Sequence, residues 1–246
     1  MKGILNDLLN NKMPIIIMKI VISLGGSLLT RDLTTENFKR YVDVILKLKK
    51  DGHKLIVVCG GGKVARDYQA IAKAFNADKD QLDFVGIMGT HVNAATFCYC
   101  LGDAGYLIKW KEQEKIKPEV KKHFGKKIIV AAGYGVGCST DFDAAYLAEV
   151  VKADLLINAT NVDGVYDKDP KTNSDAKKFR KMNYKELIGI IQGNEQSPGQ
   201  YRLFDLKAAK LIQKIKLKTV IVDGTDPEEI VRVLSEDHNG TEVSFY

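Results

Sequence analysis

Three glycine-rich stretches constrain the fold of this chain more than any other feature of its sequence. They read SLGGSLLT from Ser23, CGGGKVARDY from Cys59 and AAGYGVGCSTD from Ala131. Each follows a short apolar run and precedes a segment of helical spacing, which is typical of a strand, a loop and a helix in an α/β fold. Glycine lets backbone N–H groups approach an anion without a Cβ clash, so three such loops indicate one large anionic ligand held at several points.

The remaining pattern alternates apolar strands with amphipathic helices. The predicted strands cover residues 15–23, 54–59, 127–132, 154–160, 218–223 and 241–246. The predicted helices cover residues 35–50, 64–75, 92–101, 143–152, 183–193, 205–216 and 227–234, and the polar, turn-rich residues 161–176 are hairpin-like. This alternation predicts a three-layer α/β sandwich, with a mostly parallel central sheet and helices on both faces. The glycine loops would then lie at the carboxyl ends of strands, where such sheets bind ligands.

Composition narrows the classes of function. Of the 246 residues, 45% are hydrophobic, and no apolar run approaches the roughly 18 residues of a membrane helix. The formal net charge of +6 comes mostly from scattered lysines, which favours small anions over nucleic acid as ligands. No two of the four cysteines form a C-x-x-C pair, so we expect no metal site. We expect the cysteines to be free thiols in a cytoplasmic protein. We also expect no signal peptide, and an extension at 1–17 before a single domain at 18–246.

The glycine loops do not match the common nucleotide-binding motifs. No G-x-x-x-x-G-K-[ST] sequence occurs, which argues against a Walker A loop. GYGVGC is one residue short of the G-x-G-x-x-G fingerprint, which argues against a Rossmann dehydrogenase. The segments GGGKVARDY, DFVGI, STDFDAAYLAE, TNVDGVYDKDPKTNSDAKKF and HNGT follow one another in this order along the chain. From Met18 onward, the chain therefore resembles the amino acid kinase family and, within it, the archaeal type of uridylate (UMP) kinase.

This resemblance implies an activity and an assembly. It implies the amino acid kinase fold, with an N-terminal acceptor-binding lobe and a C-terminal ATP-binding lobe. The implied reaction transfers the γ-phosphoryl group of ATP, with Mg²⁺, to UMP and gives UDP and ADP in pyrimidine nucleotide biosynthesis. The implied assembly is a hexamer built as a trimer of dimers, for which Tyr41, Tyr99 and Tyr106 are candidate subunit-face residues because aromatic residues are enriched at interfaces.

The resemblance also implies the site residues. The ATP-binding residues would be Ser23, Gly25, Gly26, Ser27, Gly62, Arg66, Thr160, Tyr166 and Asp169. The UMP-binding residues would be Gly61, Asp83, Tyr134, Gly135, Val136, Gly137, Cys138, Ser139 and Thr140. The catalytic residues would be Arg66, Asp205 and Lys210. Simpler roles stay open for three of them: a surface ion pair of Arg66 with Asp67 or Asp80, and helix capping by Asp83 and Asp205.

Two departures from the family pattern leave alternatives open. Many members place a lysine in the first strand where this chain has Ser23, so the missing charge must come from Mg²⁺, Arg66 or a lysine such as Lys210. The third glycine loop is atypical at Gly135, Val136 and Cys138, and Asp143 replaces a commoner apolar residue. One alternative is another small-molecule phosphate kinase such as isopentenyl phosphate kinase, although no histidine lies beside the second glycine loop. Another is a non-catalytic nucleotide- or oxyanion-binding member.

Overall fold

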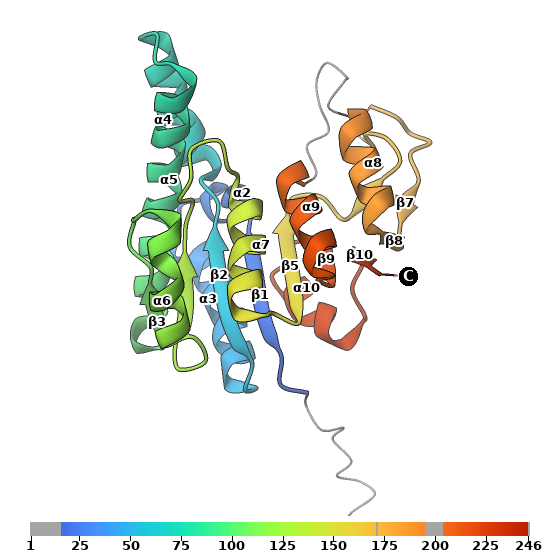
Figure 1. Cartoon of the computed structure of the whole chain (residues 1–246), viewed down its shortest axis with the longest axis horizontal. Helices are drawn as coiled ribbons and strands as arrows, with labels where there is room; N and C mark the ends of the chain where they lie inside the picture. The colour runs from blue at the N-terminus through green and yellow to red at the C-terminus, as the bar shows by residue number, and fades with distance from the viewer. Residues whose placement is uncertain (1–15, 171, 195–203, 246) are drawn as a thin grey trace, which may run out of the picture.

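The computed structural model describes residues 16–170, 172–194 and 204–245 (Figure 1). Apart from Ile16 and Ile17, the extension expected at 1–17 lies outside the described residues. No helix in the described ranges combines the length and the apolar character that crossing a membrane requires.

An eight-stranded sheet forms the centre of the fold. Its strand order is β3-β4-β2-β1-β5-β9-β10-β8, and every neighbouring pair is parallel except β9 and β10. The strands are β1 (Lys19–Leu24), β2 (Lys54–Cys59), β3 (Gly105–Leu107), β4 (Ile128–Ala131), β5 (Leu155–Thr160), β8 (Lys181–Asn183), β9 (Thr219–Asp223) and β10 (Thr241–Ser244). A separate antiparallel pair, β6 (Val165–Tyr166) and β7 (Lys178–Phe179), forms the hairpin expected in the turn-rich segment.

Helices cover both faces of the sheet, which confirms the predicted three-layer sandwich. The helices are α2 (Gly26–Thr30), α3 (Thr35–Lys50), α4 (Gly62–Ala74), α5 (Lys79–Cys100), α6 (Gln113–His123), α7 (Thr140–Val151), α8 (Tyr184–Asn194), α9 (Leu206–Ile215) and α10 (Glu228–Arg232). The core on one face joins the sheet to α2, α3, α5 and α10, and the core on the other joins it to α6, α7, α8 and α9. Side chains alternate between the two cores, so Ile20 and Ile22 pack on one face and Val21 packs on the other.

Several elements differ from the predicted ones. Helix α5 begins at Lys79 rather than near Val92, because Asp78 and Gln81 form a capping box that starts it earlier. Helix α6 was not predicted, since its sequence is very polar and buries only Ile116 and Val120 among its described side chains. The short strands β3 and β8 were also missed, because three residues carry too little periodicity to identify a strand.

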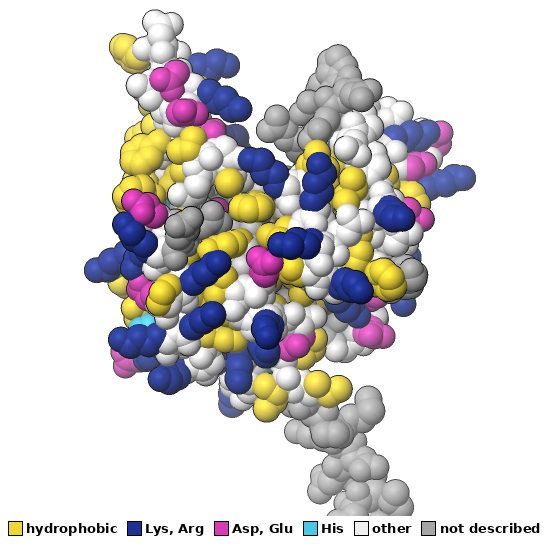
Figure 2. All heavy atoms as spheres, viewed as in Figure 1, with side chains coloured by type: hydrophobic (Ala, Val, Ile, Leu, Met, Phe, Trp, Pro, Cys, Tyr) yellow, Lys and Arg dark blue, Asp and Glu magenta, His cyan; other side chains and the backbone are white. Residues whose placement is uncertain are grey.

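The α4–α5 pair projects beyond the sheet (Figure 1), and α4 buries only Ala65. Apolar side chains gather on this projection, while lysines and arginines are scattered over the α6, α7 and α9 face (Figure 2). The predicted subunit face is wrong for Tyr41, which is buried with its hydroxyl donating to the Gly224 carbonyl. Tyr106 stacks on His123 and donates to Glu119, whereas Tyr99 is 74% exposed.

Candidate active site

The first and second glycine loops interlock at the carboxyl ends of β1 and β2. A Cβ atom added to Gly26 would lie 2.1 Å from the Gly62 nitrogen, and Gly62 itself has a φ of +58°. The Gly60 N–H donates to the Leu24 carbonyl at 2.9 Å, and the Gly25 N–H donates to the Ala159 carbonyl at 2.8 Å. The glycines are therefore needed for loop-to-loop contact as well as for any contact with a ligand, which the sequence did not reveal.

Buried polar side chains fix the shape of these loops. The Asn93 amide donates to the carbonyls of Gly60 at 2.7 Å and Gly61 at 3.1 Å. The Thr30 hydroxyl donates to the Gly26 carbonyl and accepts from the Lys63 N–H, both at 2.8 Å. Since hydrogen-bonded buried groups are held in place, the loops keep their shape without a ligand.

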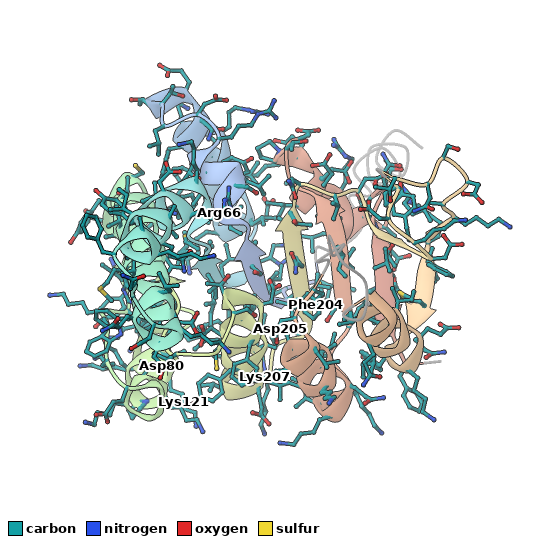
Figure 3. The ribbon with its side chains drawn as sticks, turned by 90° about the horizontal axis from the view of Figure 1, so that it is seen from above. Arg66, Asp80, Lys121, Phe204, Asp205 and Lys207 are labelled. Atoms are coloured by element: carbon teal, nitrogen blue, oxygen red, sulfur yellow. The ribbon has the colours of Figure 1, made fainter. Side chains whose placement is uncertain are left out.

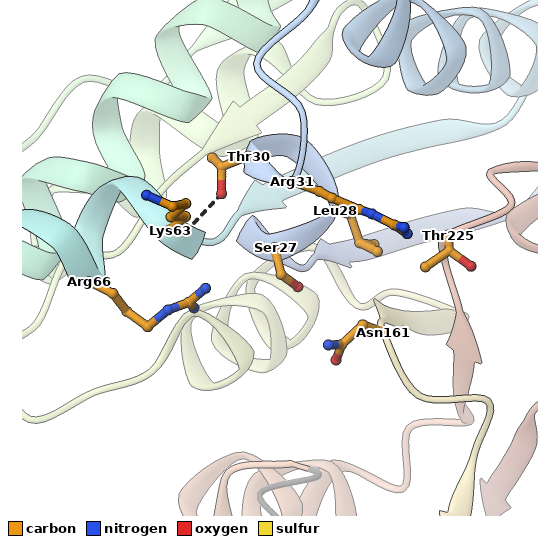
Figure 4. A pocket seen from close by; sticks show the side chains of 8 residues that line it. All are labelled: Ser27, Leu28, Thr30, Arg31, Lys63, Arg66, Asn161 and Thr225. Carbon is orange, nitrogen blue, oxygen red and sulfur yellow. Dashed lines mark hydrogen bonds between the residues drawn. The ribbon is translucent and has the colours of Figure 1, made fainter.

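A cavity of about 310 Å³ opens beside the interlocked loops (Figure 4). It is lined by Ser27, Leu28, Thr30, Arg31, Lys63, Arg66, Asn161 and Thr225. Three of these side chains are basic and none is acidic, so the cavity suits an anion. Asn161 and Thr225 follow β5 and β9, so segments far apart in the sequence meet here.

Arg66 points into this cavity from α4 (Figure 4). The alternative of a surface ion pair is wrong in the described part of the chain, because Asp67 pairs instead with Lys63 and Arg66 has no ion-pair partner there. Asp80 lies well away from Arg66 (Figure 3). A guanidinium that faces a cavity without a protein partner is suited to donate two hydrogen bonds to a phosphate group.

Two side chains from different helices hold the third glycine loop at one residue, Gly137. The Gly137 N–H donates to the Asp83 carboxylate at 3.0 Å, and the Gly137 carbonyl accepts from the Lys207 ammonium at 2.8 Å. Asp83 lies within α5, so it is not the cap of that helix, which is Asp78. Lys207 lies beside Asp205 at the start of α9 (Figure 3). This contact of Lys207 was not predicted. Lys210, predicted as a catalytic cation, is exposed and forms no side-chain hydrogen bond or ion pair in the described ranges.

The start of the third loop is fixed from α5. The Gly133 N–H donates to the Thr90 hydroxyl at 2.9 Å, and His91 Nε2 lies 2.9 Å from the Gly133 carbonyl. The Tyr134 side chain is buried, with its hydroxyl donating to the Ile108 carbonyl at 3.2 Å. The Tyr134 side chain therefore packs in the core, and only the backbone at this position is available to line the expected acceptor pocket.

The rest of the third loop leads into α7. The Cys138 N–H donates to the Gly135 carbonyl, and burial raises the pKa of the Cys138 thiol, as expected of a packing residue. Ser139 caps α7 by accepting from the Phe142 N–H at 3.2 Å, and Thr140 is the first residue of that helix. Val136, at the tip of the loop, is 48% exposed.

Three aspartates gather where α7 and α9 begin. Asp141 Oδ1 accepts from the Ser23 hydroxyl at 2.9 Å and from the Asn158 amide at 3.1 Å, and burial raises its pKa to about 6. Asp143 is buried, with Oδ2 accepting from the Tyr134 N–H, and burial raises its pKa to about 7. The nearby charge of Asp205 raises both pKa values further.

Asp205 caps α9 by accepting from the Ala208 N–H at 2.9 Å, so its simpler role is confirmed, while its place beside Asp141 also puts it in the site. Asp141 was missed as a site residue, although it directly follows the Ser139-Thr140 pair.

The residues predicted to bind ATP in the C-terminal half lie at the end of β5 and in the hairpin that follows it. Thr160 ends that strand and is half-buried, and its carbonyl accepts from the Gly224 N–H at 2.7 Å. The Tyr166 hydroxyl donates to Asp163 at 2.9 Å, and Lys178 forms an ion pair with the same carboxylate at 2.9 Å. The Asp169 carbonyl accepts from the Asn173 amide in the turn between β6 and β7. These contacts give the hairpin one defined shape around Tyr166.

Comparison with known proteins agrees with this architecture. A model of the amino acid kinase family matches residues 18–223. The uridylate kinase of Methanobrevibacter smithii is 37% identical over 226 residues, which are 92% of this chain and 99% of that protein. The uridylate kinase of Methanocaldococcus jannaschii is 42% identical over 226 residues, which are 91% of this chain and 98% of that protein.

A solved structure extends the agreement to three dimensions. The crystal structure of uridylate kinase from Archaeoglobus fulgidus matches with a TM-score of 0.78 at 34% identity, and the match covers 92% of this chain and 100% of that chain. The family match spans the glycine loops and the parallel strands that carry them, and this chain belongs to the amino acid kinase family.

Proposed function

We propose that this chain is a uridylate kinase, which transfers the γ-phosphoryl group of MgATP to UMP and releases UDP and ADP. The observation that carries the proposal is the basic cavity beside two interlocked glycine loops, with Arg66 directed into it. The two relatives that this chain matches over 98–99% of their own length are uridylate kinases, and this match indicates a nucleoside monophosphate kinase.

The proposed substrate positions follow from where the loops lie. The phosphates of MgATP occupy the cavity beside Ser27 and Arg66, and the adenosine extends toward Tyr166 and Asp169. UMP lies between the second and third loops, where Asp83 releases the Gly137 N–H and accepts from the ribose hydroxyls. In this arrangement one domain at 18–246 has an acceptor-binding N-terminal lobe and an ATP-binding C-terminal lobe.

The chemistry needs little from the protein beyond position and charge. An oxygen of the UMP phosphate attacks the γ-phosphorus in line, the bond from that phosphorus to the β–γ bridging oxygen breaks, and ADP leaves with the electron pair. The attacking phosphate oxygen is already an anion, so the step requires no general base. Arg66 neutralises part of the charge on the attacking phosphate, the transferred phosphoryl group and the leaving ADP, and the fixed loops keep these groups aligned. The Mg²⁺ bound to ATP would supply further positive charge.

A coupled assay for ADP with a panel of acceptors tests the proposal. We expect UMP to be phosphorylated faster than CMP, and isopentenyl phosphate to be a poor acceptor, because the second loop has no neighbouring histidine. Faster turnover of isopentenyl phosphate than of UMP would make the assigned acceptor wrong. Binding of MgATP without turnover of any acceptor would favour a non-catalytic member, the alternative that Ser23 leaves open.

We further propose a hexameric assembly in the cytoplasm. An apolar groove of about 540 Å³ runs between α3, α4 and α5, with Leu33, Phe38 and Val92 among its lining residues. The exposed Tyr99 lies on the same α5 helix. Contacts between subunits on these helices would brace the glycine loops that precede α4. Light scattering at micromolar concentration tests the assembly, and a 27.3 kDa species that still phosphorylates UMP would refute it.

A further inference from the structure

Two of the arginines in the described part of the chain lack any protein partner. Arg40 donates to the Thr225 carbonyl, Arg180 donates to the His238 carbonyl, and Arg232 pairs with acidic side chains. By contrast, Arg31 and Arg66 form no side-chain hydrogen bond or ion pair within the described ranges. Both line the same cavity of about 310 Å³.

The two guanidinium groups reach this cavity from opposite sides. Arg66 enters from the second turn of α4, whereas Arg31 is the C-cap residue of α2 and extends toward Thr225 (Figure 4). Ser27 lies between them (Figure 4). Asp32, the acidic neighbour of Arg31 in the sequence, forms no ion pair with it in the described structure. An exposed arginine that lines a cavity without a partner is available to a ligand.

Strand β1 carries no cationic side chain at its carboxyl end, beside the glycine loops. Ser23 stands at this position and donates to Asp141, whose other side-chain donor is the neutral amide of Asn158. No cationic side chain therefore hydrogen-bonds Asp141 in the described structure. The positive charge beside the glycine loops comes instead from the rim of the cavity.

We propose that Arg31 binds the phosphates of the donor nucleotide and, together with Arg66, supplies the positive charge that the first strand lacks at Ser23. The inference rests on the proposed function. Arg31 belongs to the donor side because it shares its side of the cavity with Thr225, which follows β9 in the half proposed to bind ATP. Its planar fork donates two parallel hydrogen bonds to phosphate oxygens, which an ammonium group does not reproduce.

Titration calorimetry with MgATP as the probe and no acceptor present tests the inference. We expect Arg31→Ala to weaken MgATP binding by about 10- to 100-fold, the range for a lost charge-assisted hydrogen bond, and Arg31→Lys to fall in between. Lys50→Ala is the matched control, because it removes one exposed positive charge at the end of α3 and should bind MgATP within about twofold of the unmodified chain. Circular dichroism establishes that each variant is folded.

Steady-state kinetics separates a role in phosphate binding from a general disturbance. With Arg31→Ala the KM for MgATP should rise while the KM for UMP stays within about twofold, since only the donor loses a contact. Unchanged MgATP affinity, or an equal rise in both KM values, overturns the inference. If Arg31→Ala weakens MgATP binding but UMP is not phosphorylated by the unmodified chain, the inference stands and the proposed acceptor is wrong. No binding of MgATP to the unmodified chain overturns both.

Discussion

Replacement of Asp143 by asparagine should make the protein more stable at alkaline pH. Asp143 is 1% exposed, its Oδ1 atom has no hydrogen-bond partner in the described structure, and its Oδ2 atom accepts a long bond of 3.3 Å from the Tyr134 N–H. Burial is the main cause that raises its pKa from 3.8 to about 7, and the charge of Asp205 adds to it. The ionised form of Asp143 is therefore destabilising, because it is a buried charge with too few hydrogen-bond partners.

The direction of the effect follows from proton linkage. Because the folded state holds this proton more tightly than the unfolded state, the contribution of Asp143 to the free energy of unfolding is highest below about pH 4 and is lost as the pH rises to about 7. At about 1.36 kcal/mol per pKa unit, the shift from 3.8 to about 7 lowers the free energy of unfolding by about 4 kcal/mol above pH 7. Asparagine stays neutral but leaves a buried amide unpaired, which costs about 1–3 kcal/mol at every pH.

The difference in the free energy of unfolding between two pH values does not depend on the amide penalty, because that penalty is the same at both. Between pH 5 and a folded pKa of about 7 there are about two units, so the Asp143→Asn variant should gain about 3 kcal/mol relative to the unmodified chain on going from pH 5 to pH 8. At pH 5 the raised pKa has already cost the unmodified chain about 1.6 kcal/mol, which offsets most of the amide penalty, so the two proteins should have nearly equal stability there. The titration of Asp141 occurs in both proteins and largely cancels from the difference.

Urea unfolding at the two pH values measures this difference. Asp43→Asn is the control, because it removes an exposed carboxylate paired with Lys39 and should change the free energy of unfolding by less than about 0.5 kcal/mol. A difference between pH 5 and pH 8 of less than about 1 kcal/mol for Asp143→Asn would refute the reasoning, as would a variant less stable than the unmodified chain at pH 8.

Three further substitutions test the site. Gly62→Ala should destabilise the fold and abolish activity, because a Cβ there would lie 2.2 Å from the Gly26 carbonyl oxygen at a φ of +58°, whereas Gly189→Ala, whose Cβ meets nothing within 4 Å, should leave the melting temperature unchanged or raised. Arg66→Ala should lower kcat/KM by about 100- to 1,000-fold in a folded protein, the loss expected of about 3–4 kcal/mol of transition-state stabilisation, and normal kinetics would remove this residue from the site. Lys207→Met should raise the KM for UMP because it releases the Gly137 carbonyl, and an equal rise in that KM for Lys210→Met would contradict a specific role of the Lys207 contact.

The fold class could be predicted without the structure. The run of buried apolar residues in β2 and the helical spacing in α3 identify elements whose burial is set by local periodicity, and both elements have their predicted bounds. Helix α6 did not follow from the sequence, because among its described side chains only Ile116 and Val120 are buried, and its many lysines and glutamates leave no clear apolar periodicity. Local pattern therefore predicts an element when apolar residues recur along it, as they do in α4, which buries only Ala65.

The sequence also located the glycine loops and Arg66, because loop residues at the carboxyl ends of parallel strands converge at one edge of the sheet. The contact of Lys207 with Gly137, and the meeting of Arg31 with Asn161 and Thr225, depended on the tertiary structure. These residues come from segments that are far apart along the chain and carry no motif of their own. Their proximity is set by the order of strands in the sheet, where β5 lies beside β1 and β9 lies beside β5, and the sequence alone does not contain this order.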